Sequence, residues 1–166
     1  MSMRDIVNAV IYRISLYLLR GRVFLQDRFK LVKSYQPNPF VPVDQQTPPW
    51  RDSIDRYLSI SQALPDMPFS CLDVGCNEGF FVFKMAERGG FCLGLDAGRN
   101  EIMVADSLAK IYKVNNVSFI NETIDPEKSK ALPVFDVVIF MSLFHHLARH
   151  NGLEYATQIL QGISDS

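Results

Sequence analysis

Several features that would place this chain in a specialised class are scarce or missing. Only three of its 166 residues are cysteines and no Cys-x-x-Cys pair occurs, which disfavours a zinc site. No Gly-Lys-Ser or Gly-Lys-Thr occurs, so the chain has no P-loop. The formal net charge is only −1, which does not favour a general nucleic-acid binder. Three free thiols suit a reducing compartment, which predicts a cytoplasmic protein.

What is present is ordinary for a globular protein, with 48% hydrophobic and 21% charged residues. A chain of this length forms one domain, or one domain with an appendage. Its charge is unevenly distributed. Residues 1–33 hold seven basic and two acidic side chains, a net of +5, so the remainder carries −6.

Residues 3–20 are predicted to form a basic amphipathic helix, because apolar residues recur there at helical spacing. Arg13 interrupts the apolar run, which is too short to cross a bilayer, and no small-residue cleavage site follows. Three alternatives stay open. The helix packs on the domain or on a second subunit, it lies on an anionic membrane surface, or it is a mitochondrial presequence.

The composition divides the chain into three segments. Residues 1–33 form the basic helical extension, residues 34–49 form a linker with five prolines, and residues 50–166 form the main domain. The first helix of that domain is predicted over residues 48–63. Thr47 is its expected N-cap and Pro48 lies in its first turn.

From residue 69 onward, strand patterns alternate with helix patterns, which predicts an α/β fold with a parallel sheet and right-handed crossovers. Asn100 is expected to cap the second helix of this region. The apolar run at residues 135–140 is typical of a strand buried on both faces. The last helix is expected to bury Leu153, Ala156, Leu160 and Ile163. We expect strands at 69–74, 91–95, 117–120 and 135–140, helices at 78–88, 100–113 and 152–163, and a polar loop at 124–133.

The first strand passes directly into a helix through a glycine-containing loop, residues 75–79. Gly75 and Gly79 permit backbone angles closed to other residues and let a ligand approach the main chain. The helix behind them offers unpaired N–H groups. A dinucleotide fingerprint would need glycine in place of Asn77 and Phe80, and Asp73 would repel a pyrophosphate.

The string Leu-Asp-Val-Gly-Cys-Asn-Glu-Gly instead resembles motif I of the class I S-adenosylmethionine-dependent methyltransferases, with Asn77 at the middle glycine. Asparagine tolerates the left-handed backbone conformation better than most residues. The resemblance implies a Rossmann-like fold with helices on both faces of the sheet, and S-adenosyl-L-methionine as the cofactor. Asp96, 23 residues after Asp73, is similar to the family's acidic residue that accepts the ribose hydroxyls. The cofactor contacts implied by the resemblance are Asp73, Gly75, Cys76, Asn77, Gly79, Asp96, Ala97, Glu122, Thr123, Met141 and Ser142.

The stretch Phe-Asp-Val-Val-Ile-Phe-Met-Ser-Leu-Phe-His-His-Leu, from Phe135 onward, is similar to the family's strand-four motif, which lines the cleft between cofactor and acceptor. Its ending is similar to methyltransferases that act on bacterial surface polysaccharides. His145 and His146 are candidate general bases, although helix capping or substrate shaping is the simpler role for them. No carboxylate cluster accompanies them, so we expect no metal. Arg56 is a candidate partner for the cofactor's carboxylate, or else lies on a solvated helix face.

The resemblance predicts a methyltransferase that acts on a small-molecule or glycan acceptor. Two alternatives stay open: a cofactor-binding module without turnover, and an RNA methyltransferase, which only the basic N-terminal segment supports. The family's sheet has seven strands in the order 3-2-1-4-5-7-6, whereas this chain supplies 3-2-1-4. The domain is therefore expected to be truncated after strand four. The open edge would be covered by the N-terminal helix or by a second copy in a homo-oligomer.

Overall fold

The computed structural model describes residues 35–42, 52–65 and 68–165. The predicted helix at residues 3–20, most of the linker and the Thr47 cap lie outside these ranges. The chain divides into two compact units, Met1–Ser53 and Ile54–Ser166, and the second unit contains the sheet. Among the described residues, no helix is long and apolar enough to cross a membrane.

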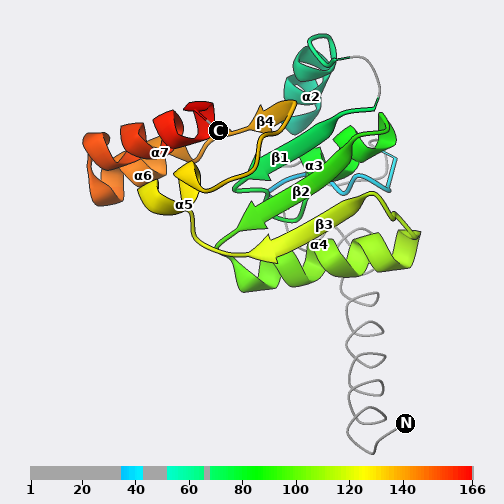
Figure 1. Cartoon of the computed structure of the whole chain (residues 1–166). Helices are drawn as coiled ribbons and strands as arrows, with labels where there is room; N and C mark the ends of the chain where they lie inside the picture. Colours follow the sequence, from blue (N-terminus) through cyan, green and yellow to red (C-terminus); the bar gives the residue numbers. More distant parts are fainter. Residues whose placement is uncertain (1–34, 43–51, 66–67, 166) are drawn as a thin grey trace, which may run out of the picture. The chain divides into compact units, whose positions relative to one another are not determined.

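Four parallel strands form one sheet in the order β3-β2-β1-β4 (Figure 1). This confirms the predicted fold class and strand order. Parallel strands place their carboxyl ends at one edge, where open α/β sheets bind ligands. The strands are β1 (Ser70–Val74), β2 (Phe91–Asp96), β3 (Val117–Asn121) and β4 (Val137–Ile139).

The register brings the motif residues of neighbouring strands together. Asp73 in β1 pairs with Gly94 in β2 and with Ile139 in β4. Asp96 at the end of β2 pairs with Asn121 at the end of β3. The glycine loop after β1 and the turn after β2 therefore leave the sheet side by side.

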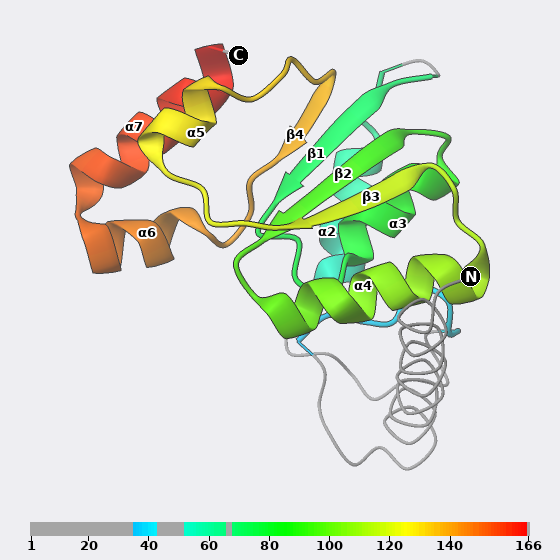
Figure 2. The same ribbon diagram turned by 60° about the horizontal axis from the view of Figure 1, so that its bottom comes forward.

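Helices cover both faces of the sheet, as predicted (Figure 2). Three of them, α2, α3 and α4, supply apolar side chains to one core, and α6 and α7 supply side chains to the core on the opposite face. The short helix α5 packs against α7. The helices are α2 (Ser53–Ser61), α3 (Phe80–Glu87), α4 (Arg99–Tyr112), α5 (Pro126–Lys130), α6 (Phe144–Asn151) and α7 (Leu153–Asp165).

Helix α3 is apolar on almost every side because it is buried on almost every side, as the sequence predicted. It starts directly after the glycine loop, so the packing of α3 fixes the position at which that loop ends. Its buried residues are Phe80, Phe81, Val82, Phe83, Met85 and Ala86.

Two boundary predictions are wrong. The loop predicted at 124–133 contains α5, which Asp125 caps by accepting hydrogen bonds from the backbone N–H groups of Glu127 and Lys128, with Pro126 in the first turn. The second correction concerns α4, whose N-cap is Gly98 and not Asn100, which lies within the helix.

The C-terminal prediction also needs correction. One helix was expected at 152–163, but the described chain forms α6 and α7, separated at Gly152. Helix α7 buries Ala156, Ile159 and Ile163, while Leu153 and Leu160 are 66% and 43% exposed. The apolar face is thus rotated relative to the predicted one, because α7 packs on α5 and α6 and also supplies side chains to the core beneath β1.

Strand β4 is shorter and less buried than predicted. It spans Val137–Ile139, and only Ile139 is fully buried. Val138 is 37% exposed. Within the described residues β4 pairs only with β1, which confirms the expected edge position, whereas the predicted burial on both faces is wrong.

The corrected face of α7 can be tested by two neighbouring substitutions. Ile159→Ala should lower the free energy of unfolding by about 2–5 kcal/mol, because Ile159 is 0% exposed and its truncation leaves a cavity. Leu160→Ala should change it by less than about 0.5 kcal/mol. Urea denaturation measures both, and equal losses would contradict the assigned face.

Candidate functional site

The loop between β1 and α3 forms the centre of the site. Its backbone is anchored to β2, because the N–H groups of Gly75 and Cys76 both donate to the carbonyl oxygen of Leu95, at 2.7 and 3.1 Å. Gly75 and Gly79 have φ values of 81° and 85°. Asn77 has φ of 53°, which confirms that it adopts the left-handed conformation at the middle position.

The loop lies close against the neighbouring strands. A Cβ atom added to Gly79 would lie 2.8 Å from the ring of Phe119, and one added to Gly94 would lie 2.7 Å from the same ring. Both distances are below ordinary contact. The ring of Phe119 therefore leaves room only for glycine at both positions. This explains why position 94 is a glycine, and it gives Gly79 a packing role in addition to its positive φ.

Asp96 joins the glycine loop to the turn after β2. One carboxylate oxygen accepts a hydrogen bond from the N–H of Asn77 at 2.8 Å, and the other accepts one from the N–H of Gly98 at 2.7 Å. Each oxygen keeps a second lone pair. The two carboxylate oxygens of Asp96 are thus fixed as acceptors at the carboxyl edge of the sheet, by donors in the segments that follow β1 and β2.

Asp73 is buried just beneath this edge. It is 3% exposed, and its Oδ2 atom has no hydrogen-bond partner among the described residues. Burial, and then the nearby carboxylate of Asp96, raise the pKa of Asp73 to about 8. Such a carboxyl group is poorly satisfied in the protein alone and would gain from a cation or hydrogen-bond donor placed above it.

The cysteines are buried, with no disulfide among them. Cys76 is 0% exposed, and burial raises the pKa of its thiol. Contact with Cys92 and burial raise the pKa of Cys71. Protonated, inaccessible thiols are poor nucleophiles, so Cys76 shapes the loop by filling space.

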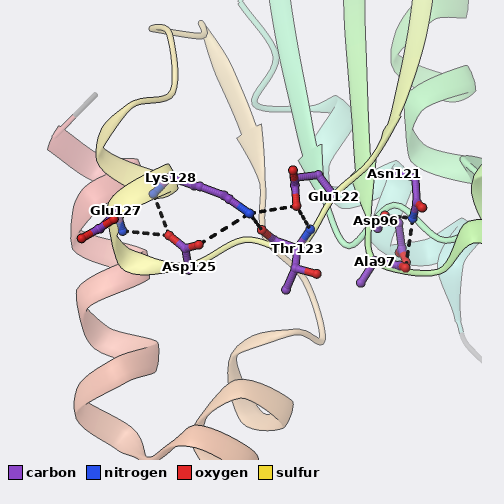
Figure 3. A network of polar contacts seen from close by, with 8 residues as sticks. All are labelled: Asp96, Ala97, Asn121, Glu122, Thr123, Asp125, Glu127 and Lys128. Atoms are coloured by element: carbon purple, nitrogen blue, oxygen red, sulfur yellow. Dashed lines mark hydrogen bonds and ion pairs between the residues drawn. The ribbon is translucent and has the colours of Figure 1, made fainter.

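Polar contacts extend the edge from Asp96 to α5 (Figure 3). The side-chain amide of Asn121 donates to the carbonyl oxygens of Asp96 and Ala97, each at 3.0 Å. The Glu122 carboxylate accepts hydrogen bonds from the Thr123 N–H and the Lys128 ammonium, each at 2.8 Å. The Lys128 hydrogen bond is the main cause that lowers the pKa of Glu122.

On the other side of the loop, Arg56 of α2 reaches the turn after β4. Its guanidinium donates a hydrogen bond to the hydroxyl oxygen of Ser142 at 3.1 Å. Ser142 has φ of 59°, a conformation that costs about 1–3 kcal/mol for a residue other than glycine. The turn that carries Met141 and Ser142 is therefore held in a strained shape next to a cation.

His145 and His146 lie in the first turn of α6, with ring centroids 4.1 Å apart. Both side chains are exposed. Helix α6 begins beside the glycine loop, because a Cβ atom on Gly75 would lie 3.4 Å from the side chain of Leu143, the N-cap. In the part of the chain that the structure describes, no group of His, Cys, Asp and Glu side chains could hold a metal ion.

The structure brings together more residues than the motifs indicated. Asn121 and Lys128 were not predicted, although both lie in the network that reaches Asp96 (Figure 3). A signal existed for each. Asn121 is the last residue of a parallel strand, and the Asp-Pro pair before Lys128 is typical of a helix start.

Comparisons with known proteins agree with this geometry. Residues 68–160 match the family described as "Methyltransferase domain". The O-antigen chain terminator bifunctional methyltransferase/kinase WbdD of Escherichia coli is 26% identical over 118 residues, which cover 67% of this chain and 16% of that protein. A ubiquinone biosynthesis O-methyltransferase of Salmonella paratyphi A is 33% identical over 85 residues, 51% of this chain and 35% of that one.

A crystal structure of WbdD superimposes with a TM-score of 0.71 at 28% identity, covering 90% of this chain and 34% of that chain. This chain therefore spans well under two thirds of the length of each of these relatives.

The raised pKa of Asp73 predicts a stability that falls as pH rises. The unfolded chain releases this proton near the ordinary pKa of 3.8, while the folded protein retains it up to its pKa of about 8. Between these values the unfolded state binds fewer protons, so the free energy of unfolding falls by up to about 1.4 kcal/mol per pH unit.

Asp73→Asn removes the titrating group and should flatten this dependence. Urea denaturation of both proteins, from about pH 5 to about pH 8, measures the slopes. Parallel curves for the two proteins would show that Asp73 is ionised in the folded protein across this pH range, which would contradict its raised pKa.

Proposed function

The chain belongs to the methyltransferase domain family, and from this premise we propose that it binds S-adenosyl-L-methionine and transfers its methyl group to a small-molecule or glycan acceptor. The observation that carries the proposal is the Asp96 carboxylate. It is fixed by the Asn77 and Gly98 N–H groups, and its two oxygens can accept the two ribose hydroxyls.

The environment of Asp73 favours a positively charged ligand. A buried carboxyl group with an unsatisfied oxygen would be stabilised by a nearby cation, and S-adenosyl-L-methionine carries both a sulfonium and an ammonium group. The Asp96 carboxylate would repel the pyrophosphate of a dinucleotide, and Asp73 would add to this repulsion wherever it is ionised. This chemistry favours S-adenosyl-L-methionine over a nicotinamide or flavin cofactor.

The remaining contacts are assigned by position along the edge. Glu122 and Thr123, next to Asp96, would contact the adenine. Gly75, Cys76, Asn77 and Gly79 would surround the middle of the cofactor. Ala97, Met141 and Ser142 would line the adjoining surfaces. Arg56, beside Ser142, would hold the methionine carboxylate, because a guanidinium has further donors after the one used for Ser142.

When bound, the cofactor supplies a methyl group made electrophilic by a positively charged sulfur. The protein's task is then mainly orientation, which can contribute on the order of 7–11 kcal/mol to catalysis. The strained turn at Ser142 and the adjacent start of α6 would shape the acceptor side. His145 or His146 would remove the proton from an acceptor hydroxyl, a step typically worth about 10²–10⁴-fold.

The proposed acceptor class is based on the names of two relatives. One is named for termination of the O-antigen chain and another for ubiquinone biosynthesis, which suggests a glycan hydroxyl or a small-molecule hydroxyl.

We further propose that residues 50–166 act as the cofactor-binding domain. Residues 1–33 would serve as a basic attachment segment for a membrane surface or a second copy, joined by the linker at 34–49.

Cofactor binding is the first test. Calorimetry should detect binding of S-adenosyl-L-methionine and of its demethylated product, S-adenosylhomocysteine. Asp96→Asn should raise both dissociation constants about 10- to 100-fold, since it removes charge from the acceptor of two hydrogen bonds worth about 1.5–3 kcal/mol each.

Asp106→Asn is the matched control for that experiment. Asp106 lies on α4, where it is about half exposed and forms an ion pair with Lys110. Its substitution should leave both dissociation constants unchanged. Failure of the wild type to bind either compound, or equal affinities for wild type and Asp96→Asn, would refute the proposed site.

Catalysis is tested at α6. With a panel of glycan and phenolic hydroxyl acceptors, the double variant His145→Gln/His146→Gln should lower kcat by about 10²–10⁴-fold without changing cofactor affinity. His150→Gln, an exposed position of the same helix, serves as the control. Wild-type turnover in the double variant would exclude the two histidines as general bases.

A further inference from the structure

We infer that Lys128 is a positioning residue that holds Glu122 in the orientation in which it selects a purine with a 6-amino group. This inference rests on the proposed function, because it assumes that the base of the cofactor lies against Glu122 and Thr123. It assigns a role to α5, the helix that the sequence pattern failed to predict.

The segment after β3 is fixed on one side by the turn that carries Asp96. The backbone N–H of Glu122 donates to the carbonyl oxygen of Asp96 at 3.0 Å. The Asn121 side chain donates to the carbonyl oxygens of Asp96 and Ala97. The main chain at Glu122 therefore has a defined place relative to the carboxylate that would bind the ribose.

Lys128 fixes the same segment from the other side (Figure 3). Its ammonium donates to Oε1 of Glu122 at 2.8 Å and to the carbonyl oxygen of Thr123 at 3.1 Å. It also lies 3.6 Å from Oδ2 of Asp125. One cation thus holds both the side chain of Glu122 and the main chain of the next residue.

Helix α5 keeps Lys128 in place. Asp125 caps its first turn by accepting a hydrogen bond from the Lys128 N–H at 2.8 Å. One residue later, Ser129 is 0% exposed and packs where a Cβ atom on Gly162 of α7 would overlap its hydroxyl. The base of the Lys128 side chain is therefore anchored to the α5–α7 pair.

This arrangement leaves one acceptor oxygen of Glu122 available. Among the described residues, both hydrogen bonds to the carboxylate end on Oε1, from Thr123 and Lys128. Oε2 keeps its acceptor capacity, and the side chain is 46% exposed. A 6-amino group could donate to Oε2, whereas a 6-oxo group would place an acceptor against an acceptor.

The Lys128 ion pair contributes little to folding, because both partners are about half exposed and solvent screens their attraction. Its effect should therefore appear in base selectivity. Loss of Lys128 leaves Oε1 without its ammonium partner and frees Glu122 to rotate away from the base.

The test compares two ligands that differ only at position 6 of the purine, S-adenosylhomocysteine and S-inosylhomocysteine. Calorimetry with the full chain gives the ratio of their dissociation constants. We expect the wild type to prefer the adenosyl compound by about tenfold or more, the worth of one hydrogen bond to a charged group. Lys128→Met should reduce this ratio at least about threefold, and Glu122→Ala should abolish it.

Two further variants separate positioning from general damage. Lys128→Arg keeps a cation and should restore most of the ratio. Lys110→Met removes an equally exposed ion pair from α4 and should leave the ratio unchanged. If the wild type binds both ligands but the ratio is unchanged in Lys128→Met or in Glu122→Ala, this inference is overturned and the proposed function is not. A wild type that binds neither ligand overturns the proposed function and this inference with it.

Discussion

The pair of hydrogen bonds from backbone N–H groups to the Asp96 carboxylate is the interaction on which the site depends. It connects Asn77 in the glycine loop with Gly98 at the start of α4, across 21 residues of sequence. The loop alone is a flexible turn with three left-handed residues. Once Asp96 accepts from Asn77, the loop, the β2 turn and the N-terminus of α4 become one structure whose acceptor oxygens face the carboxyl edge of the sheet.

The same edge contains an electrostatic conflict that a ligand can resolve. Asp73 is buried next to Asp96, and its burial together with the nearby Asp96 charge raises the pKa of Asp73. A protein that only needed to fold would place an apolar side chain in the middle of β1, as at the neighbouring positions Leu72 and Val74. An acid in that position makes the fold less stable as the pH rises toward neutral.

Much of the fold could be predicted because local patterns specify it. Short apolar runs separated by a helix require parallel strands, and Asn77 between two glycines predicts a left-handed turn. The errors have a common cause. Leu160 was predicted to be buried and the strand that contains Val138 to be buried on both faces, but hydrophobicity does not say which neighbour covers a side chain. In the structure the partners of α7 and the edge position of β4 decided both.

The sequence by itself therefore determined the parallel α/β order, the glycine loop and the spacing that places Asp73 and Asp96 at one edge, because each follows from backbone periodicity and the length of one helix and one strand. Only the tertiary structure decided which polar groups meet there. Asn121 donates a hydrogen bond to the turn at Asp96, Lys128 donates one to Glu122, and Arg56 donates one to Ser142. These contacts join residues that lie up to 86 positions apart in the sequence. Such contacts are set by how helices pack on the sheet, which no local pattern encodes.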